Sequence, residues 1–359
     1  MQSLTEYIRW LGRFSFDELP MGDADAMVMC VMSYFDLAPA LRDGTGLVSD
    51  CAPCLENGSA TLQITGGDMG NSEIFRAAIA SKRFGALRIT DYADILEPDT
   101  PMQFSAVTFR WGDGGFIAFR GTDETVAGWK EDFMIAFTET KAQRAALEYA
   151  ARVIAGGGRY SMGGHSKGGN LALYAAGMLP EEAWARVDRV FLLDGPGLCP
   201  EVMDVSVVGR VNEKATRFIP EFSVVGKLFE PAVTDTRIVC SSASGLLQHS
   251  LATWQVEYGP PALAEENDRR SLALMEVLNR WIADMSQEDR RLLTEDLFGT
   301  LEAGGAVTLS DAAGSGPLSF EAALLRMFHA SETTKKIMRD LPAQAMAVLR
   351  RQLTHGEDA

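Results

Sequence analysis

Ser166 lies in the segment of the chain that most strongly suggests chemistry. The segment reads Gly-His-Ser-Lys-Gly-Gly (residues 164–169) and contains a G-x-S-x-G pattern between an expected strand and an expected helix. On such a sharp turn the serine hydroxyl is exposed near the positive end of the helix, and the flanking glycines let neighbouring backbone approach closely. The pattern predicts a nucleophilic serine, with a glycine-rich turn of no chemical role as the alternative.

The residues around the serine favour the catalytic interpretation. Gly169 and the small apolar face of the following helix (Leu171, Ala172, Ala175 and Ala176) indicate close packing against a sheet. A phosphate-binding loop does not fit, because it requires Gly-Lys-Ser/Thr and here Lys167 follows the serine.

A nucleophilic serine needs a base, and the chain contains four histidines. His165 is part of the turn and is expected to point elsewhere, His329 lies in a helical pattern, and His355 lies in a polar tail. His249 follows an expected strand downstream of Ser166, in the order that hydrolases with this turn use. We therefore expect His249 to be the base, the alternative being a packed or solvent-facing loop histidine.

The cysteines do not indicate a second site. They number five (Cys30, Cys51, Cys54, Cys199 and Cys240), an odd and sparse set that argues against a disulfide framework and fits a reducing compartment. Cys51 and Cys54 form one C-x-x-C, which we interpret as a loop of small apolar residues rather than a metal or redox site. The sequence implies no metal and no cofactor.

Alternating strands and helices are expected to position these side chains. Strands over residues 104–109 and 116–119 form a hairpin around the turn 112–115, and the second strand leads directly into residues 120–122. A strand from residue 160, the turn, a helix and a strand over 187–193 then follow, which is typical of a mostly parallel sheet with crossover helices.

Other segments complete the expected α/β organisation. Short strands are expected at 216–219 and 237–240, and residues 41–71 are expected to be irregular. Helices are expected at 4–11, 24–37 with Asp23 as its cap, 72–83, 129–137, 141–154, 272–285, 287–298, 320–329 and 333–353. This division predicts a core with N-terminal helices over residues 1–260 and a helical C-terminal region over 261–359 packed on it.

Composition excludes several classes of protein. Of the 359 residues, 47% are hydrophobic, which suits a globular protein, and 33 Lys and Arg oppose 49 Asp and Glu for a net charge of −16. Nucleic acid is therefore not an expected partner, and attachment to anionic lipid is disfavoured. Because the chain shows no signal-like or membrane-spanning apolar run, we expect a cytoplasmic protein without an integral membrane segment.

Several motifs resemble known families. Phe-Arg-Gly-Thr (residues 119–122), Trp129 with Asp132, and residues 164–169 resemble features of the class 3 lipases over about residues 115–250. The chain more closely resembles the bacterial Mbeg-like family of unknown function. That resemblance covers most of the chain and rests on residues 17–20, Asp25, Tyr34, 129–132, 165–170, 194–197, 223–226 and 248–249.

The resemblance implies an α/β-hydrolase fold in which the turn after Phe119 forms part of an oxyanion hole. It assigns Thr122 and the backbone N–H of Lys167 as donors to the developing oxyanion. It also suggests that Arg120 and Asp132 brace this turn as an ion pair, with an exposed, unrelated pair as the alternative.

The acid of a catalytic triad has two candidates, because the class 3 lipases usually place an aspartate where this chain has Arg-Phe-Ile-Pro-Glu-Phe-Ser (residues 217–223). Asp194, at the end of the strand after the turn helix, is the first choice, since such strand ends converge on one edge of the sheet. Glu221 is the alternative acid, and Asp194 would then only cap a turn.

The residues and the resemblance together predict a serine hydrolase, an esterase or lipase-like enzyme acting on a small-molecule carboxylester or lipid such as an acylglycerol. The alternative is a non-catalytic binding or regulatory protein on the same scaffold, because a fold alone does not establish function.

Overall fold

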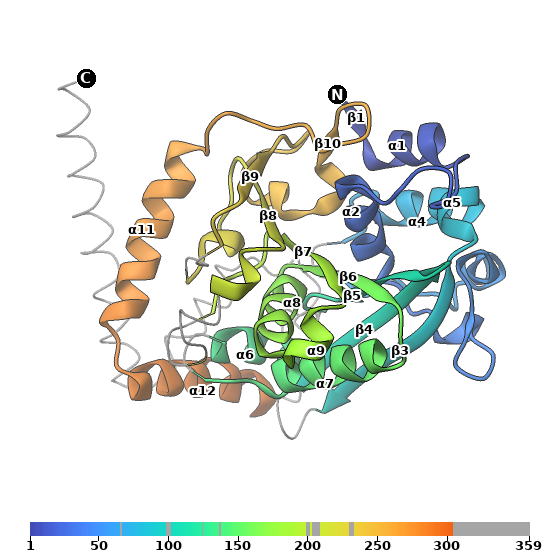
Figure 1. Ribbon diagram of the computed structural model, residues 1–359. Coiled ribbons are helices and arrows are strands. Elements are labelled where there is room, and N and C mark those ends of the chain that lie inside the picture. Colours follow the sequence, from blue (N-terminus) through green and yellow to red (C-terminus); the bar gives the residue numbers. More distant parts are fainter. Residues whose placement is uncertain are drawn as a thin grey trace.

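An eight-stranded mixed sheet forms the centre of the computed structural model (Figure 1). The structure describes residues 1–303 apart from 65–66, 98–101, 124, 136–137, 199–201, 203–208 and 230–232. The strands, in spatial order, are β2 (Gly46–Leu47), β3 (Arg88–Glu97), β4 (Met102–Trp111), β5 (Gly114–Phe119), β6 (Arg159–His165), β7 (Val187–Leu193), β8 (Ala215–Pro220) and β9 (Thr236–Val239). Strands β2 to β5 pair antiparallel, and β5 to β9 pair parallel.

Alternating side chains along the central strands face two helical layers. On β5, Phe116 and Ala118 join the hydrophobic cluster beneath the N-terminal helices, whereas Ile117 and Phe119 join the cluster on the opposite face. The first layer contains α1 (Leu4–Leu11), α2 (Asp23–Met32), α4 (Asn71–Ala80) and α5 (Lys82–Gly85). The second contains α7 (Lys141–Ala155), α8 (Lys167–Met178) and α9 (Glu181–Trp184). This three-layer arrangement, with its strand–turn–helix at the centre, confirms the predicted α/β-hydrolase fold.

Most of the predicted central elements are confirmed, including the hairpin of β4 and β5 and the full extent of β7. Strand β3 was not predicted. It carries polar residues at Arg88, Asp91, Asp94 and Glu97, and half of its length is exposed, so it lacks the apolar run by which a buried strand is recognised.

The N-terminal region differs from the prediction in four details. Helix α2 ends at Met32 rather than at residue 37, and Gly22 rather than Asp23 is its N-cap. The Asp25 carboxylate accepts the Gly22 N–H at 2.8 Å, while Asp23 pairs with Arg189 and Arg237.

Residues 41–71 are not wholly irregular, because they contain β2, a 3-10 turn η2 (Val48–Cys51) and α3 (Ala52–Glu56). Cys51 and Cys54 are free thiols within the last two elements rather than in a loop.

Two C-terminal helices confirm the predictions for residues 272–298. Helix α11 (Arg269–Asp284) runs along one side of the molecule, and α12 (Gln287–Ala303) turns beneath it and contacts α6 (Val126–Met134) (Figure 1). The helices predicted at 320–329 and 333–353 lie outside the described residues, and the division into two regions at residue 260 stays a prediction. Among the described residues, no helix combines the length and apolar character that crossing a membrane requires.

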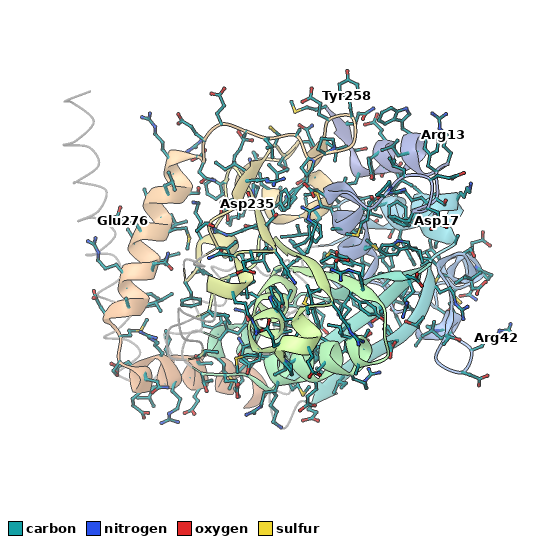
Figure 2. All side chains as sticks on the ribbon, viewed as in Figure 1. Arg13, Asp17, Arg42, Asp235, Tyr258 and Glu276 are labelled. Atoms are coloured by element: carbon teal, nitrogen blue, oxygen red, sulfur yellow. The ribbon has the colours of Figure 1, made fainter. Side chains whose placement is uncertain are left out.

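The start of the chain pairs with a segment far along it. Gln2 and Ser3 form β1 (Gln2–Ser3), which lies antiparallel to β10 (Gln255–Val256). Beside this ribbon Tyr258, which is labelled in Figure 2, packs edge-on against Trp10 with ring centroids 6.4 Å apart. The N-terminal layer is thereby joined to the segment that follows His249.

Candidate active site

Ser166 occupies a strained turn between β6 and α8. Its backbone angles are φ 57° and ψ −130°, a conformation that few non-glycine residues adopt and that is often found at functional sites. A Cβ atom on Gly164 would overlap the backbone of Gly168, and one on Gly168 would overlap the carbonyl of Phe119. The glycines of the motif are therefore required by close backbone contacts around the serine, as the pattern predicted.

His249 and Asp194 form a hydrogen-bonded pair. The Nδ1 atom of His249 lies 2.6 Å from the Oδ2 atom of Asp194, and the aspartate side chain is only 1% exposed against 31% for the histidine. The other carboxylate oxygen accepts the Ser223 hydroxyl at 2.6 Å and the Gly226 N–H at 3.1 Å. Asp194 is thus anchored by donors some 30 residues downstream and does more than cap its own turn.

Glu221, the alternative acid, has a different position in the fold. It follows β8, and its backbone carbonyl accepts the N–H of Asp268 at 2.8 Å, which ties this segment to the start of α11. The carboxylate that accepts from Nδ1 of His249 is that of Asp194. The geometry favours Asp194 over Glu221 as partner of the histidine.

His165 points away from a catalytic position, as expected. Its Nδ1 atom lies 2.8 Å from the Tyr34 hydroxyl, its Nε2 atom lies 2.7 Å from the backbone carbonyl of His249, and the two histidine ring centroids are 4.5 Å apart. Burial lowers the pKa of His165 to about 3, so this ring is neutral at ordinary pH. These contacts hold the His249 loop against the turn that carries Ser166, whereas His329 and His355 lie outside the described residues.

The turn after Phe119 lies beside Ser166. A Cβ atom added to Gly121 would lie 3.1 Å from the Cβ of Ser166. The hydroxyl of Thr122 donates to Oδ2 of Asp132 at 2.5 Å, and burial raises the pKa of Asp132 to about 6. The backbone N–H of Lys167 is in the first turn of α8, where no intrahelical carbonyl is available to it.

The predicted ion pair between Arg120 and Asp132 is wrong. Arg120 instead pairs with Asp94 at 2.9 Å and with Asp123 at 3.4 Å, and it also donates to Gln63. The pairing could not be foreseen because Asp94 lies on β3, the strand that the sequence did not reveal. Asp132 serves the same turn through Thr122 rather than through Arg120.

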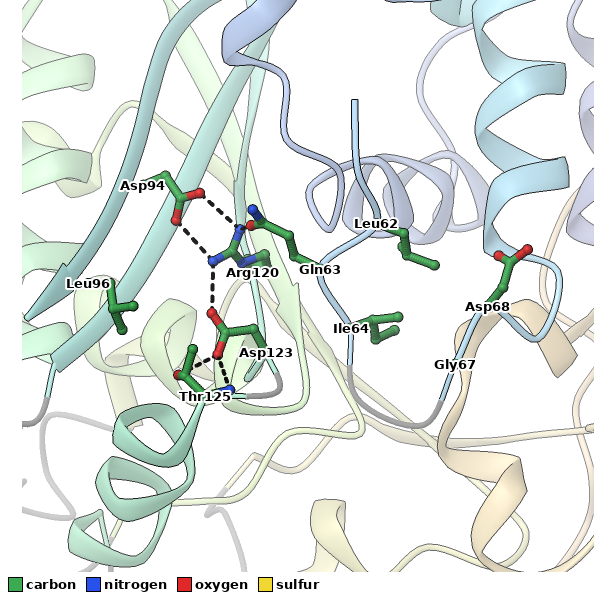
Figure 3. Close-up of a pocket in the computed structure, with 10 residues that line it drawn as sticks. All are labelled: Leu62, Gln63, Ile64, Gly67, Asp68, Asp94, Leu96, Arg120, Asp123 and Thr125. Atoms are coloured by element: carbon green, nitrogen blue, oxygen red, sulfur yellow. Dashed lines mark hydrogen bonds and ion pairs between the residues drawn. The ribbon is translucent and has the colours of Figure 1, made fainter. Parts of the chain in front are cut away.

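A cleft of about 650 Å³ opens beside this turn (Figure 3). It lies between the segment around Gln63 and the turn that follows Arg120, whose guanidinium stands between Gln63, Asp94 and Asp123. The lining residues are Leu62, Gln63, Ile64, Gly67, Asp68, Asp94, Leu96, Arg120, Asp123 and Thr125. Three carboxylates against one guanidinium give it a negative balance, and the aliphatic side chains supply apolar walls.

Some residues around the site were not assigned a role from the sequence. Tyr34 and Ser223 lie in segments that support the family resemblance, but only the structure places their hydroxyls on His165 and Asp194. Glu131 was also missed. Its carboxylate lies 3.2 Å from the buried ammonium of Lys167, and no local sequence signal indicates this pair.

Comparison with solved structures finds lipases. A fungal lipase is 12% identical over 65% of this chain and 84% of that chain, with a TM-score of 0.39. The Rhizomucor miehei lipase in its propeptide complex is 14% identical over 64% and 79%, with a TM-score of 0.39. M37 lipase is 13% identical over 81% and 96%, with a TM-score of 0.38. Comparison with curated proteins gave no match.

Comparison with family models gives a direct assignment. The model of the Mbeg1-like family matches residues 78–299, a span that includes Ser166, Asp194 and His249. Because the match extends over more than half of the sequence, the chain belongs to the Mbeg1-like family.

Proposed function

We propose that this protein is a serine hydrolase that cleaves carboxylesters, including lipid esters such as acylglycerols. Ser166 is the nucleophile, His249 the general base and Asp194 the acid of the triad. The observation that carries the proposal is the 2.6 Å contact between His249 and a fully buried Asp194, next to a serine in a strained strand-to-helix turn. An ordinary packed histidine would not need a buried carboxylate that is itself held by two further donors.

In the proposed reaction, Nε2 of His249 takes the proton of the Ser166 hydroxyl as Oγ attacks the ester carbonyl. Asp194 keeps the proton on Nδ1 of His249 and stabilises the imidazolium that forms. The imidazolium then gives its proton to the leaving alcohol, and an acyl-enzyme remains on Ser166. A water molecule, deprotonated by His249, releases the acid and restores the serine.

The oxyanion of the tetrahedral intermediate is assigned to backbone amides. The Lys167 N–H stands at the positive end of α8, and the Thr122 N–H belongs to the turn that touches Ser166 through Gly121. Because the Thr122 hydroxyl donates to Asp132, its role in this proposal is to fix the turn. Preorganised amides are effective because they need not reorient as charge develops.

In this proposal the cleft beside the turn after Phe119 receives part of an uncharged substrate; Ser166, Asp194 and His249 are not among the residues that line it. Asp68, Asp94 and Asp123 outnumber Arg120, so a free carboxylate or phosphate would be repelled, whereas Leu62, Ile64 and Leu96 suit an acyl chain. A cytoplasmic location is part of the proposal, and the free thiols of Cys30, Cys51, Cys54 and Cys240 support it.

The test combines ester hydrolysis with active-site labelling. We expect the wild type to hydrolyse p-nitrophenyl esters and to react with a fluorophosphonate, and expect Ser166→Ala to abolish both. Ser244→Ala is the control, because Ser244 is an exposed serine in the loop that leads to His249. A folded wild type that neither hydrolyses short- or long-chain esters nor takes up the probe would support the non-catalytic binding or regulatory protein instead.

A further inference from the structure

His165 is buried next to the proposed nucleophile and is hydrogen-bonded at both ring nitrogens. Nε2 lies 2.7 Å from the backbone oxygen of His249, and Nδ1 lies 2.8 Å from the hydroxyl of Tyr34. Tyr34 follows α2, and His249 ends the 3-10 turn η4 (Gly245–His249). One side chain of the serine turn thus connects two segments that are more than 200 residues apart.

The chemistry of the partners fixes the direction of both hydrogen bonds. A backbone carbonyl can only accept, so Nε2 of His165 must carry the proton. Because burial lowers the pKa of His165 to about 3, the ring is neutral and its Nδ1 atom has a free lone pair. The Tyr34 hydroxyl therefore donates to Nδ1, and a single tautomer of His165 fits this environment.

Tyr34 also contacts the proposed oxyanion turn. The Tyr34 hydroxyl lies against the backbone of Gly121, and burial raises the pKa of this tyrosine. A Cβ atom on Gly121 would overlap the hydroxyl oxygen and lie 2.7 Å from the carbonyl of His165. The Tyr34 hydroxyl is thus enclosed by the turn after Phe119 and by the segment that carries His165, and these contacts fix its orientation.

We infer that Tyr34 and His165 are positioning residues: the Nε2–H of His165 holds the backbone of His249 so that its ring keeps its bond to Asp194, and the Tyr34 hydroxyl holds the His165 ring in place by donating to Nδ1. The inference rests on the proposed function for its catalytic consequence. Neither residue is assigned a proton transfer, although the ring of His165 packs beside that of His249 with centroids 4.5 Å apart. Without the tyrosine hydroxyl the buried Nδ1 atom of His165 has no donor, so the ring is no longer held in the orientation that serves the His249 carbonyl.

The kinetic test uses Tyr34→Phe and a matched control. Tyr149→Phe removes another buried tyrosine hydroxyl, one that bonds to Thr108 and to the Asp91 carbonyl at 2.9 Å each. We expect Tyr34→Phe to lower kcat about tenfold to a hundredfold with KM within about twofold, because small misplacements of a catalytic group reduce turnover by this order. Tyr149→Phe is expected to leave both constants near wild type. An unchanged kcat in Tyr34→Phe, or an equal loss in both variants, would overturn the inference.

A second measurement does not depend on turnover. With only four histidines, a ¹⁵N-histidine-labelled chain gives few ring signals. We expect one ring to stay neutral with its proton on Nε2 from pH 5 to 8, and expect a low-field proton from the His249–Asp194 hydrogen bond. In Tyr34→Phe the Nδ1 nitrogen of that ring should shift as it loses its hydrogen-bond donor, and the low-field proton should be lost, whereas Tyr149→Phe should keep both signals of the wild type. A low-field proton that survives in Tyr34→Phe would refute the positioning role. If the wild type shows both but hydrolyses no ester and takes up no fluorophosphonate, the proposed function fails while the effect of Tyr34→Phe on the spectrum still decides the inference.

Discussion

The ammonium of Lys167 lies 3.2 Å from the carboxylate of Glu131, and both side chains are at most 1% exposed. The same ammonium donates to the backbone and side-chain oxygens of Gln103 at 2.8 and 2.6 Å. Glu131 in turn accepts from the backbone N–H groups of Gln103 and Ala142. The pair of Lys167 and Glu131 therefore connects α6 with β4 and with the start of α7, directly beside Ser166.

Breaking this pair from one side is expected to destabilise the protein strongly. Lys167→Met leaves Glu131 buried without a counter-charge, and we expect a loss of about 3 to 5 kcal/mol in the free energy of unfolding. The double variant Lys167→Met with Glu131→Gln no longer has a buried, unpaired carboxylate. It should recover part of the lost free energy of unfolding. Urea unfolding measures both values.

An exposed pair provides the control for that prediction. Lys141 and Glu97 lie 3.3 Å apart with side chains 44% and 49% exposed, so Lys141→Met is expected to change the free energy of unfolding by less than about 1 kcal/mol. Similar losses for the two lysine variants would mean that Lys167 is not held by a buried charge pair.

Replacing each candidate acid with the corresponding amide distinguishes Asp194 from Glu221. Asp194→Asn is expected to lower kcat by about 10⁴-fold, because an amide no longer orients and stabilises the His249 imidazolium. Glu221→Gln is expected to stay within about twofold of wild type, since its carboxylate is not the partner of His249. Steady-state ester hydrolysis, with circular dichroism as the check on folding, distinguishes them, and a collapse of activity in Glu221→Gln alone would reverse the assignment.

Gly168, in the turn that carries Ser166, and Gly209, elsewhere in the chain, differ in what an added methyl group would meet. Gly168→Ala would drive its Cβ into the Phe119 carbonyl, so we expect at least about a hundredfold loss of turnover as the turn shifts. Gly209→Ala is the comparison, because a Cβ there has no heavy atom within 4 Å. Ester hydrolysis and thermal unfolding of the two variants test the difference, and wild-type turnover in Gly168→Ala would show that the turn is less tightly packed than its backbone contacts indicate.

Asp132 makes stability depend on pH in a defined direction. Its pKa is raised from 3.8 to about 6 in the folded protein, so between these values the folded state binds more protons than the unfolded state. The contribution of Asp132 to the free energy of unfolding therefore falls as pH rises from about 4 to 6 and is constant above that range. Between pH 4 and 6 the free energy of unfolding of Asp132→Asn should rise by about 1 to 3 kcal/mol relative to that of the wild type. Urea unfolding at pH 4, 5, 6 and 7 measures this, and parallel pH profiles for the two proteins would contradict it.

Local sequence patterns predicted those parts of the site that consist of residues close together in the sequence. The turn around Ser166 follows from glycine spacing within six residues, and β7 and α8 follow from short apolar runs beside it. His249 could be chosen as the base because the chain offers few histidines. These inferences need no knowledge of which distant segments meet.

Contacts between distant segments could not be obtained in this way. Choosing Asp194 over Glu221 requires knowing which carboxylate reaches a histidine on a separate loop, and both follow strands of the same sheet. The partner of Arg120 depended on β3, whose half-exposed face gives a mixed polar pattern. Pairs such as Tyr34 with His165 are 131 residues apart, and periodicity within one element carries no information about them.

The ribbon of β1 with β10 bears on how the chain acquires its structure during synthesis. Gln2 and Ser3 leave the ribosome long before their partners at residues 255 and 256, which are made only after the described strands of the central sheet. A contact of such sequence separation forms late and slows folding, because a long loop must close before it contributes. The N-terminal layer therefore remains incomplete until residue 256 has emerged, and the ribbon beside the loop that carries His249 forms only after the central sheet has been made.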